Sequence, residues 1–548
     1  MISKENLQKG METLISIGPK LTGSAGQLAY IEYLKEEIRA LGLPVYADPF
    51  YFDRWEATDA SLSLIGEDGG ETPLHISSVH PYSGETPAEG VTAPLLYLSG
   101  IDKAVKAEGK IVVMKIEDLG KLPSELAFDM RSAYPADTTM PAFYNGPVAT
   151  AMVRCLAEGA LKLLKPAAAV FVWEGIPDAA VEGQWMPFIQ DYLGLPVVWL
   201  NATDGETLIA AAKEKRTARF VLTAEKEKLA YTETFYTIVE GEEKGECVIV
   251  NTHTDGPNAV EENGGVALLE LLRHVAAKKP RRTHIFLFTT GHFRLPVFKD
   301  IRTGGFQSAS RWLQYHRNLW DGRGSHLKCV ANLAVEHLGC LEWLVEDGQY
   351  VGTGRPDVEM VYTGNKYMDA LYIETVKEHR RNTRSMTLKG HNMLHFGEGQ
   401  NFFTMGIPGV CLVPGPYYLC VESPTMEVEK FDLDLMAEQT ETFLRLIEKL
   451  EAADSADFGR SEGYSFVFAH SVSGGDGFQP GHFVRRLVGS MKAGRGAEEP
   501  NSGSVRTKNR GPSFSAGTVP FSVSQRFGRS PPKRSPSASA SARHSAKP

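Results

Sequence analysis

Between residues 230 and 452 the chain alternates short apolar runs with amphipathic stretches, and this alternation limits the possible folds more than any other feature. The apolar runs have the length of buried strands, and the stretches between them have helical spacing. Strands are predicted over residues 247–252, 284–290, 329–335 and 409–413, and helices over 264–277, 305–317, 367–378 and 433–450. This order predicts an α/β fold in three layers, with helices on both faces of a mostly parallel sheet.

The first half of the chain has a different pattern. A helix is predicted over residues 27–42, where apolar residues recur at helical spacing and Gly42 closes the run. Between residues 85 and 225, short β-type runs alternate with loops and a few helices. We therefore predict four segments. They are an N-terminal part of the main domain (1–84), a β-rich insert domain (85–225), the main α/β domain (226–452) and a tail (453–548).

The predicted tail differs from the rest in composition and charge. Residues 501–548 hold nine Lys and Arg and no Asp or Glu, which leaves 49 basic against 67 acidic residues in the remainder. Ser, Gly, Pro and Arg dominate the tail, so it lacks the apolar residues of a packed core and is predicted to be disordered. The acidic remainder argues against a nucleic-acid-binding core.

Other features narrow the class of protein. The six cysteines form no Cys-x-x-Cys pair, which argues against a cysteine-based zinc site. Residues 1–13 have no apolar core of the kind that signal peptides carry, and no apolar run is long enough to span a bilayer. We expect a soluble cytoplasmic protein without a membrane span, and the sequence also allows a homo-oligomer.

Metal-binding residue types follow three predicted strands, at the point where each strand ends. His253 ends the first strand, with Asp255 and Glu261 shortly after it; His292 follows the second strand and Glu336 the third. The carboxyl ends of parallel strands meet at one edge of a sheet, where ligand sites gather. Imidazole and carboxylate groups are common zinc ligands. Asp255 could orient the His253 imidazole, and Glu261 could bridge two metal ions.

These segments resemble the co-catalytic zinc exopeptidases, a family that includes bacterial leucyl aminopeptidases and glutamate carboxypeptidases and often carries a protease-associated insert domain. His253-Thr254-Asp255 is similar to the family's His-x-Asp motif, and the segment from Glu261 to Gly265 to its Asp-Asn-x-Ser-Gly motif. The resemblance implies that His253, Glu261 and Glu336 bind the first zinc ion and that Asp255 supports His253. It also implies that residues 85–225 are a protease-associated domain.

The chain departs from this family at the second metal site. The family's general base and the next ligand form a Glu-Glu pair, where this chain has Gly291 and His292. Its last histidine ligand is replaced by Leu419. Glu262 or Glu398 could replace the base, and His292 could still bind metal. An additional imidazole could come from one of three further histidines: His337, His391 or His395.

Two functions fit this pattern. The first is a zinc-dependent aminopeptidase or related hydrolase, which uses one or two zinc ions on a peptide or small amide substrate. In that enzyme the metal ligands are His253, Glu261, His292 and Glu336, and the catalytic residues are Asp255 with Glu262 or Glu398. The alternative is a binding or scaffold protein on a catalytically degenerate peptidase fold, because fold alone does not fix function.

Overall fold

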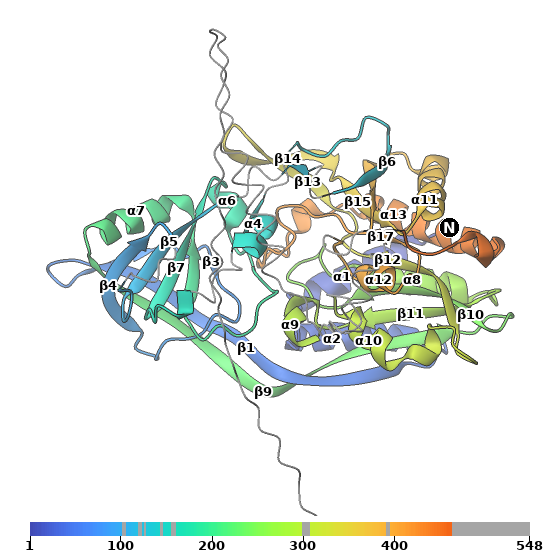
Figure 1. Ribbon diagram of the computed structural model, residues 1–548, viewed down its shortest axis with the longest axis horizontal. Coiled ribbons are helices and arrows are strands. Elements are labelled where there is room, and N and C mark those ends of the chain that lie inside the picture. Colours follow the sequence, from blue (N-terminus) through green and yellow to red (C-terminus); the bar gives the residue numbers. More distant parts are fainter. Residues whose placement is uncertain are drawn as a thin grey trace, which may run out of the picture. The chain divides into compact units, whose positions relative to one another are not determined.

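The computed structural model describes residues 1–100, 106–118, 123–124, 128–142, 146–154, 161–298, 307–390 and 395–462 (Figure 1). A 15-stranded sheet runs through these residues, and four of the predicted strands form its centre. They are β10 (Glu246–His253), β11 (Thr283–Thr289), β12 (Lys328–Val335) and β17 (Gly409–Leu412), all parallel to their neighbours in this group. The predicted α/β class with a mostly parallel sheet is confirmed.

Both sides of this centre are extended by antiparallel strands. On one side β9 (Thr217–Val239) pairs with β11; on the other β15 (Glu359–Thr363) pairs with β17 and carries β16 (Ser385–Lys389) in parallel. The outermost strand is β6 (Met130–Tyr134), antiparallel to β16. Residues 130–134 lie inside the range predicted for the insert domain, yet they pair with the sheet of the main domain.

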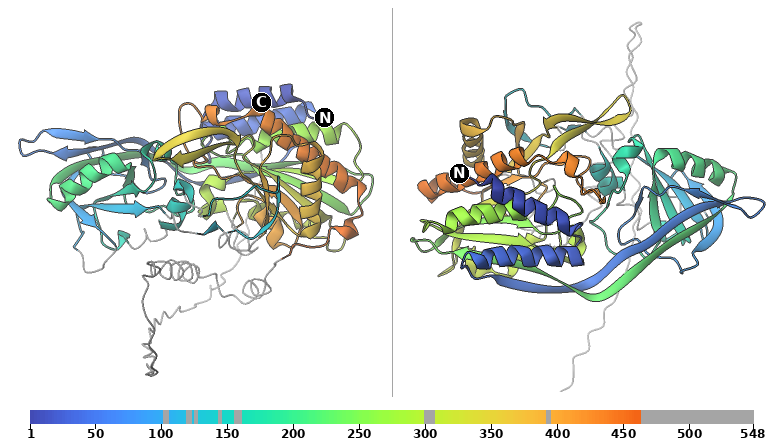
Figure 2. Two further views of the ribbon diagram at one scale, coloured as in Figure 1. Left: turned by 90° about the horizontal axis from the view of Figure 1, so that it is seen from above. Right: turned by 180° about the vertical axis from the view of Figure 1, so that it is seen from behind.

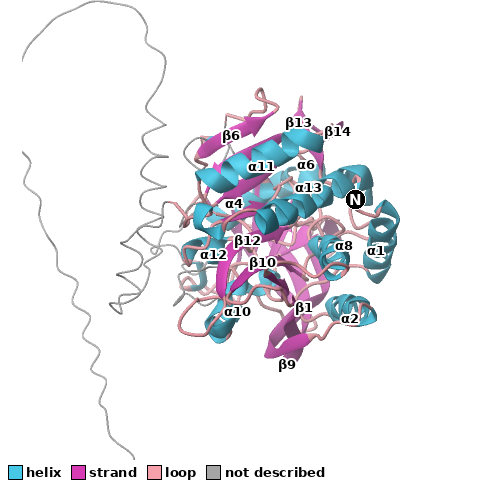
Figure 3. Cartoon of the chain, turned by 90° about the vertical axis from the view of Figure 1, so that its right-hand side faces the viewer, coloured by secondary structure: helices cyan, strands magenta, loops and turns pink. Residues whose placement is uncertain are grey.

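Helices cover both faces of the central strands (Figure 3). Side chains of β10 alternate between the two faces: Val248 and Val250 join one core, Cys247 and Ile249 the other. The first core packs under α1 (Lys4–Ile17), α2 (Ala25–Ala40), α8 (Gly264–Ala276), α11 (Lys366–His379) and α13 (Leu433–Ala452). The second packs under α10 (Ala309–Tyr315) and α12 (Gln400–Thr404).

A second group of parallel strands packs around a core of its own. Its strands are β4 (Val91–Leu98), β5 (Ile111–Glu117), β7 (Ala168–Glu174) and β8 (Val197–Leu200), with β3 (Ser78–Val79) antiparallel at the edge. Its helices are α4 (Pro147–Arg154), α6 (Asp178–Val181) and α7 (Ala202–Lys213). Trp173 and Trp199 stack with ring centroids 4.3 Å apart. This part is thus an α/β layer.

Two long strands join the two groups (Figure 2). β1 (Tyr46–Ile65) runs antiparallel to β9 over nearly its whole length, and β2 (Glu71–Leu74) turns back onto its end. The first part of β9 pairs with β4 and its last part with β11. One strand therefore belongs to both groups and crosses the boundary predicted at residue 225. The boundaries of the predicted domains stay a prediction.

The remaining elements are short. β13 (Leu341–Glu346) and β14 (Gln349–Pro356) form a separate hairpin. Single turns form η2 (His292–Arg294), α9 (Leu295–Phe298), η4 (Arg317–Leu319), η5 (Val428–Lys430) and η6 (Ser455–Asp457). In the described residues, no helix has the length and apolarity that crossing a bilayer requires.

The first ten residues of the predicted tail belong to the folded part. Phe458 is fully buried in the core under α13, and the hydroxyl of Ser455 donates to Glu246 at 2.6 Å. Ser461 donates to the carbonyl of Ile407, so the only Gly-x-Ser-x-Gly match in the sequence, which begins at Gly459, is not an exposed nucleophile. The rest of the predicted tail lies outside the described residues.

Candidate metal centre

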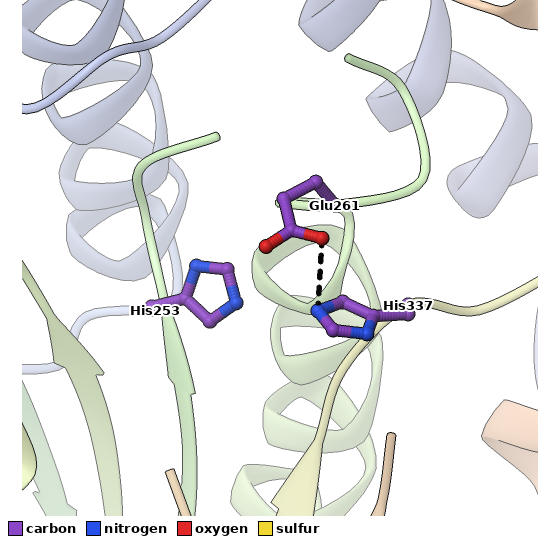
Figure 4. A group of neighbouring side chains, drawn as sticks. All are labelled: His253, Glu261 and His337. Atoms are coloured by element: carbon purple, nitrogen blue, oxygen red, sulfur yellow. Dashed lines mark ion pairs between the residues drawn. The ribbon is translucent and has the colours of Figure 1, made fainter. Parts of the chain in front are cut away.

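Three metal-binding side chains meet at the carboxyl ends of β10 and β12 (Figure 4). His253 is the last residue of β10, His337 follows β12 by two residues, and Glu261 lies in the loop before α8. One ligand atom from each residue lies within 4.8 Å of the others, and all three side chains are buried. Across the residues that the structure describes, this is the one cluster of three such groups.

A main-chain oxygen orients the ring of each of the two histidines. The Nδ1 of His253 lies 2.8 Å from the main-chain oxygen of Asp255, and the Nδ1 of His337 lies 2.8 Å from that of Pro414. A carbonyl oxygen only accepts, so each Nδ1 is the donor, and Nε2 is the ring nitrogen left to face the cluster. The Nε2 of His253 is buried and makes no hydrogen bond in the described part of the chain.

The charges of the cluster follow from burial and from its neighbours. Burial, together with the nearby His292 and His337, lowers the pKa of His253 well below its ordinary value, so this imidazole is neutral. Burial also acts to lower the pKa of His337, but the Glu261 carboxylate 3.1 Å away outweighs it and the pKa is raised. The cluster thus joins a neutral imidazole to a buried histidine–glutamate pair.

Two asparagines fix the loop that carries Glu261. The side-chain oxygen of Asn258 accepts from the main-chain N–H groups of Val260 and Glu261, while its Nδ2 faces the carbonyls of three residues: Tyr418, Leu419 and Val421. Asn263 makes two bonds to the backbone of Leu338, directly after His337. The loop is therefore tied to both neighbouring turns.

Close packing of α8 on the sheet sets where this loop ends. A side chain at Gly264 would place its Cβ 2.2 Å from the hydroxyl oxygen of Thr252 and 2.2 Å from the carbonyl of Val335. Only glycine fits at this approach, and Gly264 is the first residue of α8. The helix start is thus held against the ends of β10 and β12, beside the cluster.

Asp255 has a different contact from the one that the sequence suggested. Its carboxylate accepts from the hydroxyl of Thr22 at 2.5 Å and from the N–H groups of Gly291 and Phe293 at 3.2 and 3.0 Å. The oxygen that orients His253 is the main-chain oxygen of Asp255, not its carboxylate. The carboxylate instead holds the turn that carries His292.

His292 lies beside the cluster. Its ring stacks on His253 with centroids 4.1 Å apart, and its Nε2 is 4.0 Å from Glu261. Its Nδ1 is 3.0 Å from Glu398, whose carboxylate is the main cause that opposes burial and raises the pKa of His292 to about 9. His292 is adjacent to the three clustered residues, but it is not one of them.

Glu398 is fully occupied by hydrogen bonds. Besides His292, its two carboxylate oxygens accept from the N–H and the hydroxyl of Ser308 and from the N–H of Ala309, at 2.7 to 3.1 Å. These groups begin α10, so the carboxylate joins that helix to His292. Its contacts favour a positioning role, and its role as a general base stays a prediction.

Glu336, predicted as a metal ligand, is not one of the three clustered residues, whereas its neighbour His337 is, and the ligand role of Glu336 stays a prediction. One Glu336 oxygen accepts from the N–H of Glu398 at 2.7 Å, and the other is buried without a hydrogen-bond partner in the described residues. The backbone of His337 is left-handed, with a φ of 55°, and its ring lies toward Glu261. Burial raises the pKa of Glu336 to about 7.

Glu262, the other predicted base, is ion-paired in the core. The Nζ of Lys20 lies 2.9 Å from its carboxylate, and both side chains are fully buried. Burial raises the pKa of Glu262 to about 7, against the opposing effect of Lys20. The ion pair with Lys20 favours a structural role for Glu262, and its role as a general base stays a prediction.

The structure also shows why the departures at Gly291 and Leu419 change the site. Gly291 has φ 95, and a Cβ there would lie 2.1 Å from the ring of Phe298, so this position has no room for a glutamate. Leu419 is buried in an apolar cluster.

His395 stacks on Tyr362 with centroids 4.3 Å apart, and His391 lies outside the described residues.

The fold of this chain is similar to that of solved aminopeptidases. No family model and no curated protein matches the sequence. Among solved structures, a zinc aminopeptidase from Bacillus subtilis is similar with a TM-score of 0.58 and 15% identity, over 85% of this chain and 99% of that one. An aminopeptidase from Aneurinibacillus sp. strain AM-1 is similar with a TM-score of 0.54 and 14% identity, over 85% and 96%.

A third similar structure is a Peptidase M28 precursor from Shewanella amazonensis SB2B. It has a TM-score of 0.55 and 13% identity, over 82% of this chain and 95% of that chain. At such identities the likeness establishes the fold, and the chain therefore has a co-catalytic zinc exopeptidase-like fold. Its activity depends on the residues of its own site.

Proposed function

We propose that this chain is a zinc-dependent hydrolase that cleaves peptide bonds or related amide bonds. The observation that carries the proposal is the cluster of His253, Glu261 and His337, in which both imidazoles are oriented through Nδ1 and one ligand atom of each residue lies within 4.8 Å of the others. Two histidines and one glutamate are a ligand set of catalytic zinc sites, which keep a position open for water or substrate. The fold likeness to zinc aminopeptidases supports the same reaction class.

A bound zinc ion would supply Lewis-acid chemistry, polarising a carbonyl and lowering the pKa of water. The chain's own residues hold the geometry for it. The carbonyls of Asp255 and Pro414 fix the two rings, and Asn258 fixes the loop of Glu261. His292, held by Glu398, presents its Nε2 beside Glu261, where a substrate oxygen or a second ion would be bound.

We assign the proton-accepting role to Glu336. Of three nearby glutamates, Glu398 is saturated by hydrogen bonds and Glu262 is paired with Lys20. Glu336 has a buried oxygen that makes no hydrogen bond to any described residue. Its carboxylate interacts electrostatically with His337 and His292, which supports its nearness to the cluster.

A second candidate is a binding protein that has lost catalysis. The observation that favours it is the closed position of the family's base: Phe298 fills the space beside Gly291. In this case the buried His337–Glu261 pair would be structural, and the protein would carry no stoichiometric zinc.

Zinc content and two variants separate these functions. We expect about one equivalent of zinc in the gently purified protein, a loss of about 100-fold or more in zinc affinity for His337→Gln, and no change for the control His395→Gln. Glu336→Gln should keep its zinc and lose at least about 100-fold in peptide turnover. Less than a tenth of an equivalent of zinc in the wild-type protein would reject the enzyme, and full turnover in Glu336→Gln would reject the proposed base.

A further inference from the structure

Two cysteines lie side by side on neighbouring strands of the central sheet. Cys247 in β10 and Cys329 in β12 are register partners, and the two strands are parallel. Both side chains belong to the core under α10 and α12, so both point to the same face of the sheet. Each cysteine is the second residue of its strand, whereas the metal cluster lies at the carboxyl ends of the same strands.

The spacing of the two strands suits a disulfide bond. Neighbouring strands lie about 4.8 Å apart, and the Cα atoms of linked cysteines usually lie about 4.4 to 6.8 Å apart. A β-bulge follows the pair directly, because Val248 is opposite Ala331 and leaves Val330 without a partner in β10. The regular ladder is thus already interrupted beside Cys329, which gives this residue room to approach Cys247.

The two side chains are free thiols that interact with each other. The thiol of Cys247 donates to the carbonyl of Leu319, and that of Cys329 to the carbonyl of Ala331, both at 3.2 Å. The contact with Cys329, followed by burial, raises the pKa of Cys247 well above its ordinary value. Cys247 is therefore protonated at neutral pH, and oxidation that depends on its thiolate is slow.

A small reagent has access to the pair from the amino ends of the strands. Lys328, the first residue of β12, is exposed to solvent. Cys329 follows it and keeps 6% of its surface exposed, whereas Cys247 is fully buried. An oxidant of the size of hydrogen peroxide therefore meets Cys329 first and has Cys247 directly behind it.

The surroundings do not support a metal site at the two cysteines. A structural zinc ion takes four ligands, so two thiolates alone are not enough. Among the described residues, the one group of three metal-binding side chains is the cluster of His253, Glu261 and His337, which contains no cysteine. His253 lies six residues beyond Cys247 in β10, a distance of about 20 Å along an extended strand. The thiol pair is therefore separate from the metal cluster.

We propose that Cys247 and Cys329 are an oxidative modification site, at which hydrogen peroxide forms an intrachain disulfide bond that fastens β10 to β12. The Cys329 sulfur attacks one peroxide oxygen, which breaks the O–O bond, leaves a sulfenic acid and releases water. The Cys247 sulfur then attacks the sulfenic sulfur, which breaks the S–O bond and releases a second water. Two thiols are oxidised, one hydrogen peroxide is reduced, and both thiol hydrogens leave in the water molecules.

The disulfide bond fastens together the two strands that lead to the metal cluster. β10 ends at His253, and His337 follows β12 by two residues. The bond closes a loop of the 81 residues between the cysteines, which includes the Glu261 loop, α8 and β11. Such a cross-link stabilises a fold mainly because it restricts the unfolded chain. The inference is independent of the proposed hydrolase, because it requires neither zinc nor turnover.

Peptide mapping of the folded, full-length protein after treatment with hydrogen peroxide tests the inference. Digestion with trypsin and then with glutamyl endopeptidase separates Cys329 from Cys340, because Glu336 lies between them. We expect one linked pair of peptides, with Cys247 in one and Cys329 in the other, from protein that keeps the mass of a single chain. Dithiothreitol should split the pair. Cys247→Ala and Cys329→Ala should each abolish it, whereas the matched control Cys420→Ala, which removes another buried thiol, should keep it.

Thermal unfolding measures the effect of the bond on the fold. The peroxide-treated wild type should unfold at a midpoint at least about 3 °C higher before dithiothreitol than after it, and Cys329→Ala should show no such difference. If one alanine variant does not fold, the other variant and the wild-type peptide map still decide the question. The inference is overturned if the folded protein yields no linked pair, if the pair forms only after unfolding in urea, or if the linked protein unfolds at the same midpoint as the reduced one.

Discussion

Replacing Asn258 by alanine should both destabilise the protein and weaken metal binding. This fully buried side chain accepts two main-chain N–H bonds at 3.1 and 3.3 Å and faces three carbonyls at 2.9 to 3.0 Å. An NH₂ group has two hydrogens, so about four bonds are made in full, each worth about 1 kcal/mol. We expect a loss of about 3–4 kcal/mol in the free energy of unfolding.

The metal effect follows because two of these bonds hold the loop of Glu261. Loss of such outer contacts usually lowers metal affinity by about 10- to 100-fold. The assays are urea unfolding followed by fluorescence, and zinc affinity by competition with a chelator. The matched control is Asn201→Ala, which removes one cap bond to Asp204 at the start of α7 and should cost about 1 kcal/mol without changing zinc affinity. If Asn258→Ala costs no more than this control and binds zinc normally, the reasoning is refuted.

Three further variants test other features. Gly291→Ala should destabilise by about 3 kcal/mol, and adding Phe298→Ala should relieve part of that cost in a double-mutant cycle; strictly additive costs would contradict the clash. Lys20→Met should cost about 3–5 kcal/mol, of which a second change, Glu262→Gln, should restore a part; no restoration would show that the charge pair is not the cause. Burial lowers the pKa of His284 to about 4, so its neutral form stabilises the fold above pH 6.5 and that stability, up to about 3 kcal/mol, is lost as the pH falls toward 4. The thermal midpoint of His284→Gln should therefore fall less between pH 7 and 4.5 than that of the wild type. Equal decreases of the two thermal midpoints would contradict this.

The fold class could be predicted from the sequence because its signals are local. The apolar runs at residues 247–252 and 329–335 correspond to β10 and β12, since strands buried on both faces need continuous apolar residues. The same reasoning missed the length of β1 and β9. Their exposed and buried positions change along the chain as the ribbon passes from one strand group to the other. No single period describes such strands.

The edge of the sheet at which the site lies could also be predicted from the sequence. His253 ends β10 and Glu261 follows it, and any parallel sheet brings the ends of such strands to one edge. The roles of these residues as zinc ligands stay a prediction. His337 carried only a weak signal, its position next to Glu336 at the end of a predicted strand.

The sequence by itself determined the parallel sheet, its helices on both faces and the edge that bears the polar side chains, because periodicity and strand ends are properties of neighbouring residues. Only the tertiary structure decided which side chains meet there. The ring of His337 lies toward Glu261 because the residue forms a left-handed turn, its Nδ1 bonds to the carbonyl of Pro414, and Asn263 bonds to the backbone of Leu338. The carboxylate of Glu336 instead accepts from the backbone N–H of Glu398. These partners lie 62 to 77 residues apart in the chain, and only folding brings them together.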